Sequence, residues 1–310
     1  MTWIIRWLRS IPAALWLVLV SIALIAYPWV VPEYYIHLLV YILIGGLFAQ
    51  SFNIMFGYMG KLSFGHAAFF GIGAYTAALL VTKADMPFLT IIPIAMVVTG
   101  VIGLLVGIFC VRRAGYYFAI LTMAFGQLLF VVVHKWYAFT AGDDGIQGIP
   151  IPEILESVTV HYYYVLVIVA IAMVIMWRIL HGPFGYTLRA IRDNSVRTEF
   201  NGVNIVQVQM VAFVIACIFA GLAGALFAPF NRAVTPALLD WTKSAEPVNM
   251  TIIGGPYTFL GPMIGAIIFN AIQSVILDYT YYWPFVIGLI IIPIILFLPG
   301  GIVGFFTQKK

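Results

Sequence analysis

Residues 88–110 read FLTIIPIAMVVTGVIGLLVGIFC, a run without a single charged side chain. A transmembrane helix needs about 20 apolar residues to cross about 30 Å of hydrocarbon, so this run is long enough to span a bilayer. The whole chain shares this character. Of its 310 residues 64% are hydrophobic and only 8% are charged, against about 25% charged residues in soluble domains. The sequence therefore predicts an all-α integral membrane protein, with one polytopic helical domain over residues 1–310.

Apolar runs separated by charges, Gly and Pro predict about ten transmembrane segments. They are residues 12–31, 36–56, 62–82, 88–110, 115–137, 161–180, 206–228, 246–257, 261–279 and 284–299. The eighth segment is too short to cross unaided. We expect it to be a tilted half-helix or one arm of a re-entrant hairpin, which is tolerated where it packs in protein or lines a cavity.

The distribution of basic residues predicts the orientation. With the N-terminus inside, eleven of the 15 Lys and Arg residues fall on the inner side. The outer side receives Lys83, Lys135, Arg232 and Lys243. Basic residues concentrate in cytoplasmic loops, so both termini are expected in the cytoplasm. The net charge of +4 is spread too sparsely to indicate a nucleic-acid partner.

The largest inner loop, about residues 181–205, contains the pattern of one short helix over residues 186–200. Arg189, Asp193 and Arg197 lie four residues apart, which predicts a ladder of charges on one exposed face. Leu188 and Ile191 cover another face. Such a short helix needs a docking partner to be stable. The alternative is an amphipathic helix that lies on anionic lipid headgroups.

Glycines cluster at a break between spans in each half of the chain. The two sets are Gly57, Gly60, Gly65, Gly71 and Gly73 with Ala74, and Gly254, Gly255, Gly261 and Gly265 with Ala266. Glycine-interrupted segments at matching places in two halves point toward the substrate path of a transporter. The alternative is that these glycines only allow helices to approach closely.

Polar side chains within predicted spans are the remaining candidates for a site. Ser63 and His66 follow the Gly57–Gly60 break, where they face a substrate cavity or hydrogen-bond a neighbouring helix. The candidates for the substrate path are Asn53, Gly60, Ser63, Gly65, His66, Gly254 and Gly255. The five histidines do not cluster at ligand spacings, so no metal site is expected.

Residues 57–75, GYMGKLSFGHAAFFGIGAY, resemble the hallmark of the LivM-type permeases. These are transmembrane subunits of ATP-binding cassette importers for branched-chain amino acids. Three further stretches agree, namely 185–204, 220–226 and 253–266. The resemblance covers roughly residues 36–300, nearly the whole chain.

The resemblance implies partners that this chain lacks. They are a LivH-like permease, two LivG- and LivF-like ATPases in the cytoplasm that use ATP and magnesium, and an extracytoplasmic amino-acid binding protein, all at the inner membrane of a prokaryote. It implies no cofactor in this chain. It also makes the 185–204 segment the coupling helix that docks into an ATPase groove, through Gly185, Arg189, Ala190, Ile191, Arg192, Asp193, Asn194, Glu199 and Gly202. Asp193 stands where the family usually has Glu, and Arg197, Thr198, Phe200 and Asn201 depart from smaller or aliphatic residues.

Other function classes fit less well. An ion-coupled secondary transporter usually needs charges at mid-membrane, and the predicted span centres almost lack them. A membrane enzyme would show clustered His, Asp or Cys near one interface, and a channel a selectivity element. The chain contains no GxxxxGK[ST] motif, so ATP hydrolysis is expected in another subunit. Branched-chain amino acids are the leading substrates. Urea, short amides, other amino acids and sugars are the alternatives.

Overall fold

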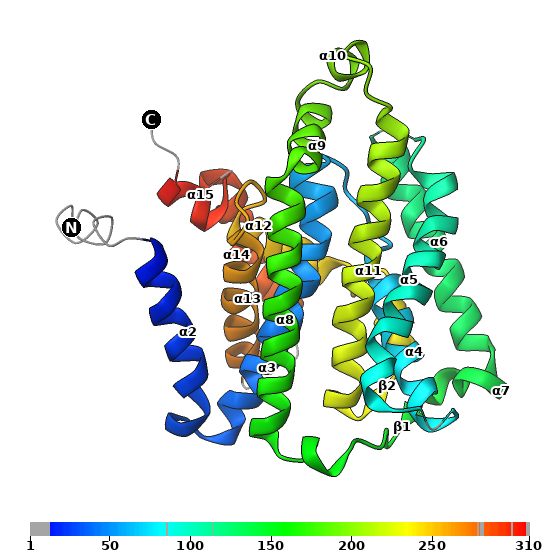
Figure 1. The fold of residues 1–310 in the computed structure, drawn as a ribbon, viewed down its shortest axis with the longest axis vertical. Helices are drawn as coiled ribbons and strands as arrows, with labels where there is room; N and C mark the ends of the chain where they lie inside the picture. Colours follow the sequence, from blue (N-terminus) through cyan, green and yellow to red (C-terminus); the bar gives the residue numbers. More distant parts are fainter. Residues whose placement is uncertain are drawn as a thin grey trace.

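A computed structural model describes residues 13–84, 86–113, 115–277, 279, 282–298 and 300–307. In it, helices stand side by side as a bundle (Figure 1). The helices that match the ten predicted segments are α2 (Ala13–Val30), α3 (Glu33–Asn53), α4 (His66–Thr82), α5 (Phe88–Cys110), α6 (Tyr116–Lys135), α8 (Val158–His181), α11 (Ile205–Asn231), α12 (Ala245–Gly254), α13 (Gly261–Leu277) and α14 (Trp283–Phe297).

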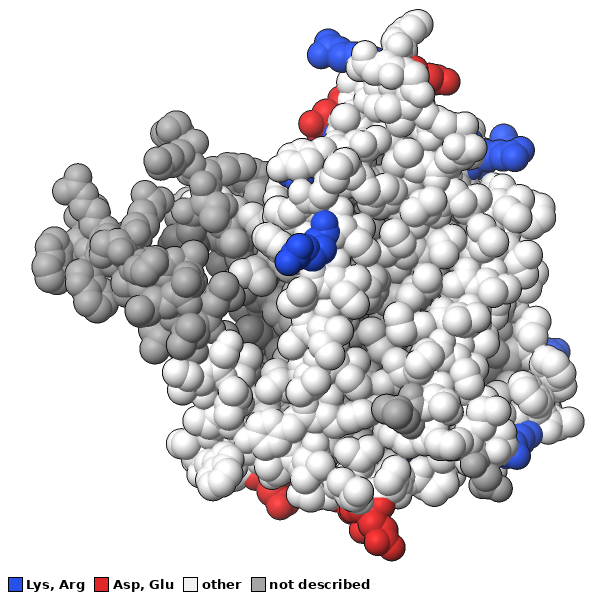
Figure 2. Space-filling model, viewed as in Figure 1, with Lys and Arg blue, Asp and Glu red and all other residues white. Residues whose placement is uncertain are grey.

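Six helical segments among the described residues are long and apolar enough to cross a bilayer. They are Glu33–Tyr58, Thr90–Cys110, Tyr116–Lys135, Val158–His181, Ile205–Asn231 and Pro284–Phe305. On the face seen in Figure 2, charged side chains lie toward the upper and lower ends, and the middle is almost wholly uncharged. An all-α membrane protein is thereby confirmed, and the count of ten crossings stays a prediction.

The chain between α3 and α4 breaks the helical pattern inside the bundle. α3 continues into a π-helical turn, η1 (Ile54–Tyr58), and regular structure resumes only at His66. The 17 residues of α4 rise about 25 Å. Their far end reaches the lower end of the bundle, where Lys83 Nζ donates to the carbonyl oxygen of Phe139 at 2.8 Å. The predicted span 62–82 therefore begins with four non-helical residues.

A second break precedes α12. The strand β2 (Ala233–Val234), which pairs antiparallel with β1 (Ile146–Gln147), lies at the lower end, and α12 lies in the upper half (Figure 1). Residues 235–244, including η4 (Pro236–Leu239), climb between them without an α-helix. The expected half-helix is confirmed, because α12 has ten residues and rises about 15 Å. Its re-entrant course through a membrane stays a prediction.

The two breaks meet. The backbone N–H of Ala67, in the first turn of α4, donates to the hydroxyl of Ser244, just before α12, at 3.0 Å. From this point α4 runs toward the lower end. α12 runs toward the upper end, where its last residues pack against α15 (Gly301–Thr307).

The core forms around α11, which packs against α3, α4 and α5. Glycines allow the helix backbones to approach. A Cβ on Gly224 would lie 1.8 Å from the carbonyl oxygen of Phe70, and one on Gly73 would lie 2.1 Å from that of Gly221. Small residues at such crossings are the usual means of packing helices in membranes. The lower end carries α7 (Tyr137–Thr140), η2 (Gly142–Asp144) and η3 (Glu153–Leu155).

Candidate functional site

Two helices project from the upper end of the bundle, α9 (Pro183–Asp193) and α10 (Ser195–Phe200) (Figure 1). Pro183 opens α9, a position where its missing N–H has no helical partner to lose. Leu188 and Ile191 are buried, at 0% and 3% exposure, as their spacing predicts. Their burial fixes the face that α9 turns toward the bundle.

The single helix predicted over residues 186–200 is wrong. Asn194 is extended, with φ −159° and ψ 97°, and separates α9 from α10. Its side-chain oxygen accepts the backbone N–H of Arg197 at 2.9 Å and so caps α10. Asn and Ser favour helix starts over helix interiors, and this signal was present in Asp193-Asn194-Ser195. The predicted charge ladder is wrong as well, since Asp193 pairs with its neighbour Arg192 at 3.0 Å.

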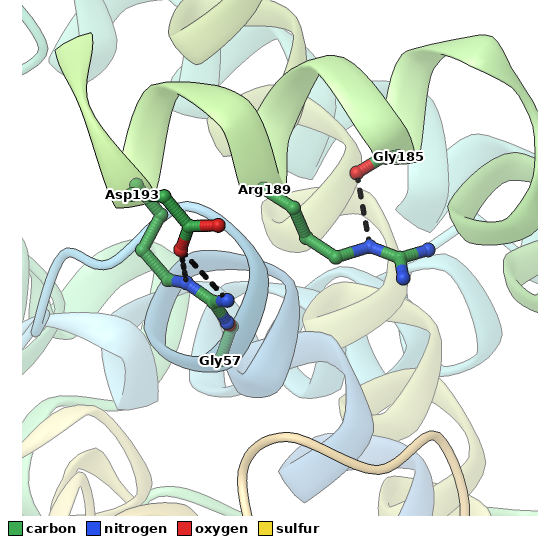
Figure 3. Close-up of polar contacts among 5 residues, drawn as sticks. Gly57, Gly185, Arg189 and Asp193 are labelled. Carbon is green, nitrogen blue, oxygen red and sulfur yellow. Dashed lines mark hydrogen bonds and ion pairs between the residues drawn. The ribbon is translucent and has the colours of Figure 1, made fainter.

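Arg189 turns inward to the end of α8. Its Nη2 donates to the carbonyl oxygen of Leu180 at 3.0 Å, and its Nε to that of Gly185 at 3.4 Å (Figure 3). The guanidinium also lies over the ring of Tyr186, 4.6 Å from its centroid. A Cβ on Gly185 would lie 2.0 Å from the Leu180 carbonyl oxygen, so only glycine fits there. Arg189 and Gly185 therefore fasten α9 to α8.

Arg192 joins three separate parts of the chain. Its Nη1 donates to the carbonyl oxygen of Gly57 in η1 at 2.5 Å, while Nε and Nη2 donate to Asp193. Its guanidinium lies 5.2 Å from the ring centroid of Tyr257, between α12 and α13. Gly60, at φ +74°, lies against the Arg192 side chain, where a Cβ would come within 2.7 Å of Cγ. This junction links α9 to the break after α3 and to the turn between α12 and α13.

The tip of the projection is exposed and partly apolar. Val196 and Phe200, four residues apart on α10, are 61% and 88% exposed. Ala190, Asn194, Glu199 and Gly202 are exposed too. Gly202 ends the segment at φ +83°, a conformation that favours glycine, as the predicted terminator would.

The predicted polar candidates for the substrate path lie buried at the end of α3, in the break before α4 and at the start of α4. Asn53, Ser63 and His66 are all at 0% exposure. His66 Nε2 shares a hydrogen bond with the hydroxyl of Ser51 at 2.9 Å, and its ring stacks on Phe48 with centroids 5.3 Å apart. Within the described part of the chain, His66 Nδ1 and the side-chain polar atoms of Gln50, Asn53 and Ser63 find no hydrogen-bond partner. The alternative in which His66 hydrogen-bonds a neighbouring helix is therefore met at Nε2, one of its two ring nitrogens.

The predicted path glycines sit at close backbone approaches. A Cβ on Gly65 would lie 1.9 Å from the carbonyl oxygen of Thr122, and one on Gly254 1.8 Å from that of Gly261. Gly255, at φ +118°, packs against the turn before α15. These contacts agree with the close-packing alternative. The path role of these glycines stays a prediction.

A cavity of about 320 Å³ opens between α3, α11, α12 and α13. Its lining residues are Leu38, Tyr41, Ile44, Gly45, Phe48, Phe70, Phe227, Lys243, Glu246, Met250, Asn270, Gln273, Ser274 and Leu277. None of the seven predicted path residues is among them. Phe48 connects the two places, because it lines the cavity on one side and stacks on His66 on the other.

An ion pair lies in the wall of this cavity. Lys243 Nζ is 2.7 and 2.8 Å from the two carboxylate oxygens of Glu246, and the side chains are 25% and 22% exposed. Lys243 lies in the cavity wall and not on an open loop, while its predicted place on the outer side of the membrane stays a prediction. It precedes Ser244, which contacts Ala67 about one α4 length, some 25 Å, from the lower end. The sequence shows no sign of this position, since a charged loop between two apolar runs ordinarily lies outside the membrane.

Comparisons with known proteins find similar permeases. Residues 34–296 match the family model described as "Branched-chain amino acid transport system / permease component". The LivM permease protein of the high-affinity branched-chain amino acid transport system of Escherichia coli (strain K12) is 25% identical, over 94% of this chain and 75% of that protein. The corresponding protein BraD of Pseudomonas aeruginosa is 23% identical, over 83% of this chain and 91% of its own length. The ribose import permease RbsC of Bacillus subtilis is 25% identical over 41% of this chain and 37% of its own length. No solved structure matches.

Proposed function

The chain belongs to the family of branched-chain amino acid permease components, and we propose that it forms the membrane path of an importer driven by separate ATPase subunits. The relatives with the broadest coverage carry branched-chain amino acids in their names. Leucine, isoleucine and valine are therefore the proposed substrates. Urea, short amides and other amino acids remain the alternatives, and the ribose permease similarity adds sugars.

The projection of α9 and α10 supports the proposal that separate ATPases drive transport. Phe200 and Val196 expose apolar surface at the end of the molecule that holds Arg189, Arg192 and Arg197. Exposed apolar patches rimmed by charge mark protein interaction sites. We assign this tip to the groove of a cytoplasmic ATPase. From the distribution of basic residues, we also propose that both chain termini lie in the cytoplasm.

The junction at Arg192 supplies a route from that tip into the bundle. A push on α9 reaches Gly57 and Tyr257 through one side chain. Gly57 belongs to the break after α3, and Tyr257 follows the C-terminal end of α12. A small shift at a packed junction is amplified when the helices around it can pack in two alternative arrangements. The ATPases bind ATP and magnesium, so this chain needs no cofactor of its own.

The further partners follow from the same assignment. We propose a second, LivH-like permease, two LivG- and LivF-like ATPases, and an extracytoplasmic binding protein at the lower end, in the inner membrane of a prokaryote. An ion-coupled transporter is the competing function. The Lys243–Glu246 pair gives it an intramembrane charge, although the pair is neutral overall.

The test is reconstitution. The chain is co-purified with the candidate permease and ATPases and placed in proteoliposomes with the binding protein. Uptake of labelled leucine, urea and ribose is then measured with and without ATP. We expect ATP-dependent uptake of leucine. Uptake driven by a proton gradient in the absence of the ATPases would overturn the proposal.

A pair of matched variants tests the docking tip. Val196→Asp with Phe200→Asp should abolish co-purification of the ATPases, because it places charge in a proposed apolar contact. Ile154→Asp changes a residue that is 77% exposed at the opposite end, and it should leave the complex intact. Normal assembly of the double variant would show that the tip is not the docking element.

A further inference from the structure

The cavity between α3, α11, α12 and α13 holds an ion pair that packing alone does not call for. Removing two charges from water costs several kcal/mol per ion unless partners compensate. Ionisable groups inside membrane proteins are accordingly rare and mark substrate or ion pathways. Lys243 and Glu246 pair with each other, yet each keeps about a quarter of its side chain open. Both therefore present a charge to whatever enters.

The other polar groups in the cavity wall are largely engaged within the protein. The Tyr41 hydroxyl donates to Asn231 Oδ1 at 2.9 Å. Asn270 Nδ2 donates to the carbonyl oxygen of Ala266 at 2.8 Å, and the Ser274 hydroxyl to that of Ala271 at 3.0 Å. The ion pair, together with the amide of Gln273, thus supplies most of the polar character of the site.

Apart from Gly45 and the amide side chain of Gln273, the rest of the wall is apolar and aromatic. It consists of Leu38, Ile44, Phe48, Phe70, Phe227, Met250 and Leu277. The cavity volume of about 320 Å³ lies at the lower end of the usual range of about 300–1,000 Å³ for small-molecule sites. A ligand that fits has a small apolar body and one compact polar end.

We infer that this cavity binds the zwitterion of an α-amino acid with an apolar side chain, with its ammonium group against Glu246 and its carboxylate against Lys243. This inference rests on the proposed function and adds the place and the means of recognition. The ligand enters the pair as a neutral dipole, so the total charge of the site does not change. An amino acid with a net charge would bring one charge without a partner. A sugar carries neither charge, so it would leave the two ions paired only with each other.

The cavity lies where a substrate would bind before it passes the barrier formed by Phe48 and Phe70. Leu38, near the start of α3, and Leu277, at the end of α13, line the lower part of the cavity. Phe48 and Phe70, with ring centroids 4.7 Å apart, line the wall deeper in. Behind Phe48 lies His66 with the buried polar groups of Gln50 and Ser51. Displacement of the two rings would open the cavity toward those groups.

The experiment uses the assembled importer and a leucine analogue with a photoreactive diazirine in its side chain. After irradiation, the labelled peptides are identified by mass spectrometry. We expect label within residues 38–48, 243–250 or 270–277. Excess L-leucine should suppress it. Leucinol, which lacks the carboxylate, and 4-methylpentanoate, which lacks the ammonium group, should compete at least about tenfold less well, since each loses a charged hydrogen bond.

Variants test the ion pair directly. Lys243→Met and Glu246→Gln should each reduce labelling at a fixed probe concentration at least about tenfold. The exchanged pair, Lys243→Glu with Glu246→Lys, keeps the neutral pair and should recover most of it. Lys135→Met changes an exposed lysine away from the cavity and should have no effect. Subunit assembly of every variant is checked by size-exclusion chromatography.

The outcomes separate the two proposals. If the wild-type importer takes up leucine with ATP but the label maps elsewhere, the cavity is not the site and the proposed function stands. The cavity is likewise ruled out as the site if leucinol, 4-methylpentanoate or D-ribose competes as well as leucine. If the assembled complex shows no ATP-dependent amino-acid uptake, the proposed function itself falls. Label in the cavity of wild type, recovered by the exchanged pair, supports the inference.

Discussion

The Nη1 atom of Arg192 in α9 donates a hydrogen bond of 2.5 Å to the carbonyl oxygen of Gly57, which lies 135 positions earlier in the chain. Gly57 belongs to the π-helical turn that ends α3, and a Cβ there would lie 2.1 Å from the carbonyl oxygen of Pro256. The guanidinium group therefore stands beside two backbone segments that already touch. This relationship makes Arg192 the connection between the projecting helices and the interior.

Replacement of Arg192 by Ala should uncouple transport from ATP hydrolysis. A hydrogen bond from a charged group contributes about 1.5–3 kcal/mol, so loss of the contact to Gly57 should lower ATP-dependent uptake roughly tenfold or more. ATPase binding should persist, because the exposed tip at Val196 and Phe200 is unchanged. Uptake and ATP hydrolysis are measured together in proteoliposomes.

The control for this prediction is Arg197→Ala. It removes the same charge from the neighbouring helix α10, where Arg197 is exposed. Uptake per ATP hydrolysed should stay near the wild-type ratio. Equal loss in the two variants would mean that the net charge of the segment matters, and not the contact to Gly57.

Asn194→Ala should weaken ATPase docking by loosening α10. The Asn194 side chain caps this six-residue helix by accepting the Arg197 N–H. Loss of such a cap costs about 1 kcal/mol, roughly a fivefold change in an equilibrium. The dissociation constant of the ATPase is measured by titration in detergent. Asn194→Asp keeps the cap and should retain affinity.

Asn204→Ala provides a matched comparison. Asn204 caps α11 in the same way, by accepting the N–H of Gln207 at 3.1 Å. α11 has 27 residues and is held by the core, so loss of its cap should leave docking unchanged. A similar drop in both variants would trace the effect to general destabilisation.

The helices could be predicted from the sequence because each is a long apolar run, such as residues 88–110, and length alone separates such runs from soluble structure. The non-helical stretch before His66 was missed because Leu62-Ser63-Phe64 is as apolar as its surroundings. Backbone geometry there depends on what packs against it. Hydropathy carries no such information.

In the candidate site, too, the features set by local spacing could be predicted, and the contacts between distant segments could not. Leu188 and Ile191 were predicted as buried, since local helical spacing decides that. The contacts of Arg192 with Gly57 and of Ser244 with Ala67 join residues more than a hundred positions apart. Lys243 and Glu246 are only three residues apart, but the cavity wall around them forms only when distant segments come together. No local pattern therefore shows that this pair lines a cavity.

Lys61 should make the folded chain more stable at alkaline pH. Its Nζ donates to the carbonyl oxygens of Val111 and Arg113 and to Gln209 Oε1, at 2.8, 3.0 and 2.8 Å. Burial lowers the pKa of Lys61 from 10.5 to about 8. The folded state thus holds fewer protons than the unfolded state between those values, so stability rises with pH through this window and is flat below it.

The comparison for Lys61 is the Lys61→Arg variant, which stays charged throughout. Thermal unfolding in detergent is followed from pH 7 to 10.5. The midpoint difference between wild type and variant should be constant up to about pH 8 and then grow in favour of wild type. If the midpoint difference shrinks above pH 8, the pKa of Lys61 is not lowered by burial in the folded state.

Gly224→Ala should prevent proper packing of α11 on α4. The added Cβ would lie 1.8 Å from the carbonyl oxygen of Phe70 and 2.9 Å from the backbone nitrogen of Ala74, and neither backbone atom can move without shifting α4. Overpacking of this kind costs about 1–3 kcal/mol or more. Gly288→Ala in α14 is the control, since a Cβ there meets nothing within 4 Å among the described residues and alanine favours a helix. We expect a lower unfolding temperature and reduced yield for Gly224→Ala, and wild-type or higher stability for Gly288→Ala. Equal stability of the two variants would show that the contact between α4 and α11 is looser than the structure has it. In that case the first turn of α4, and with it the contact of Ala67 with Ser244, would not be held in place by this crossing.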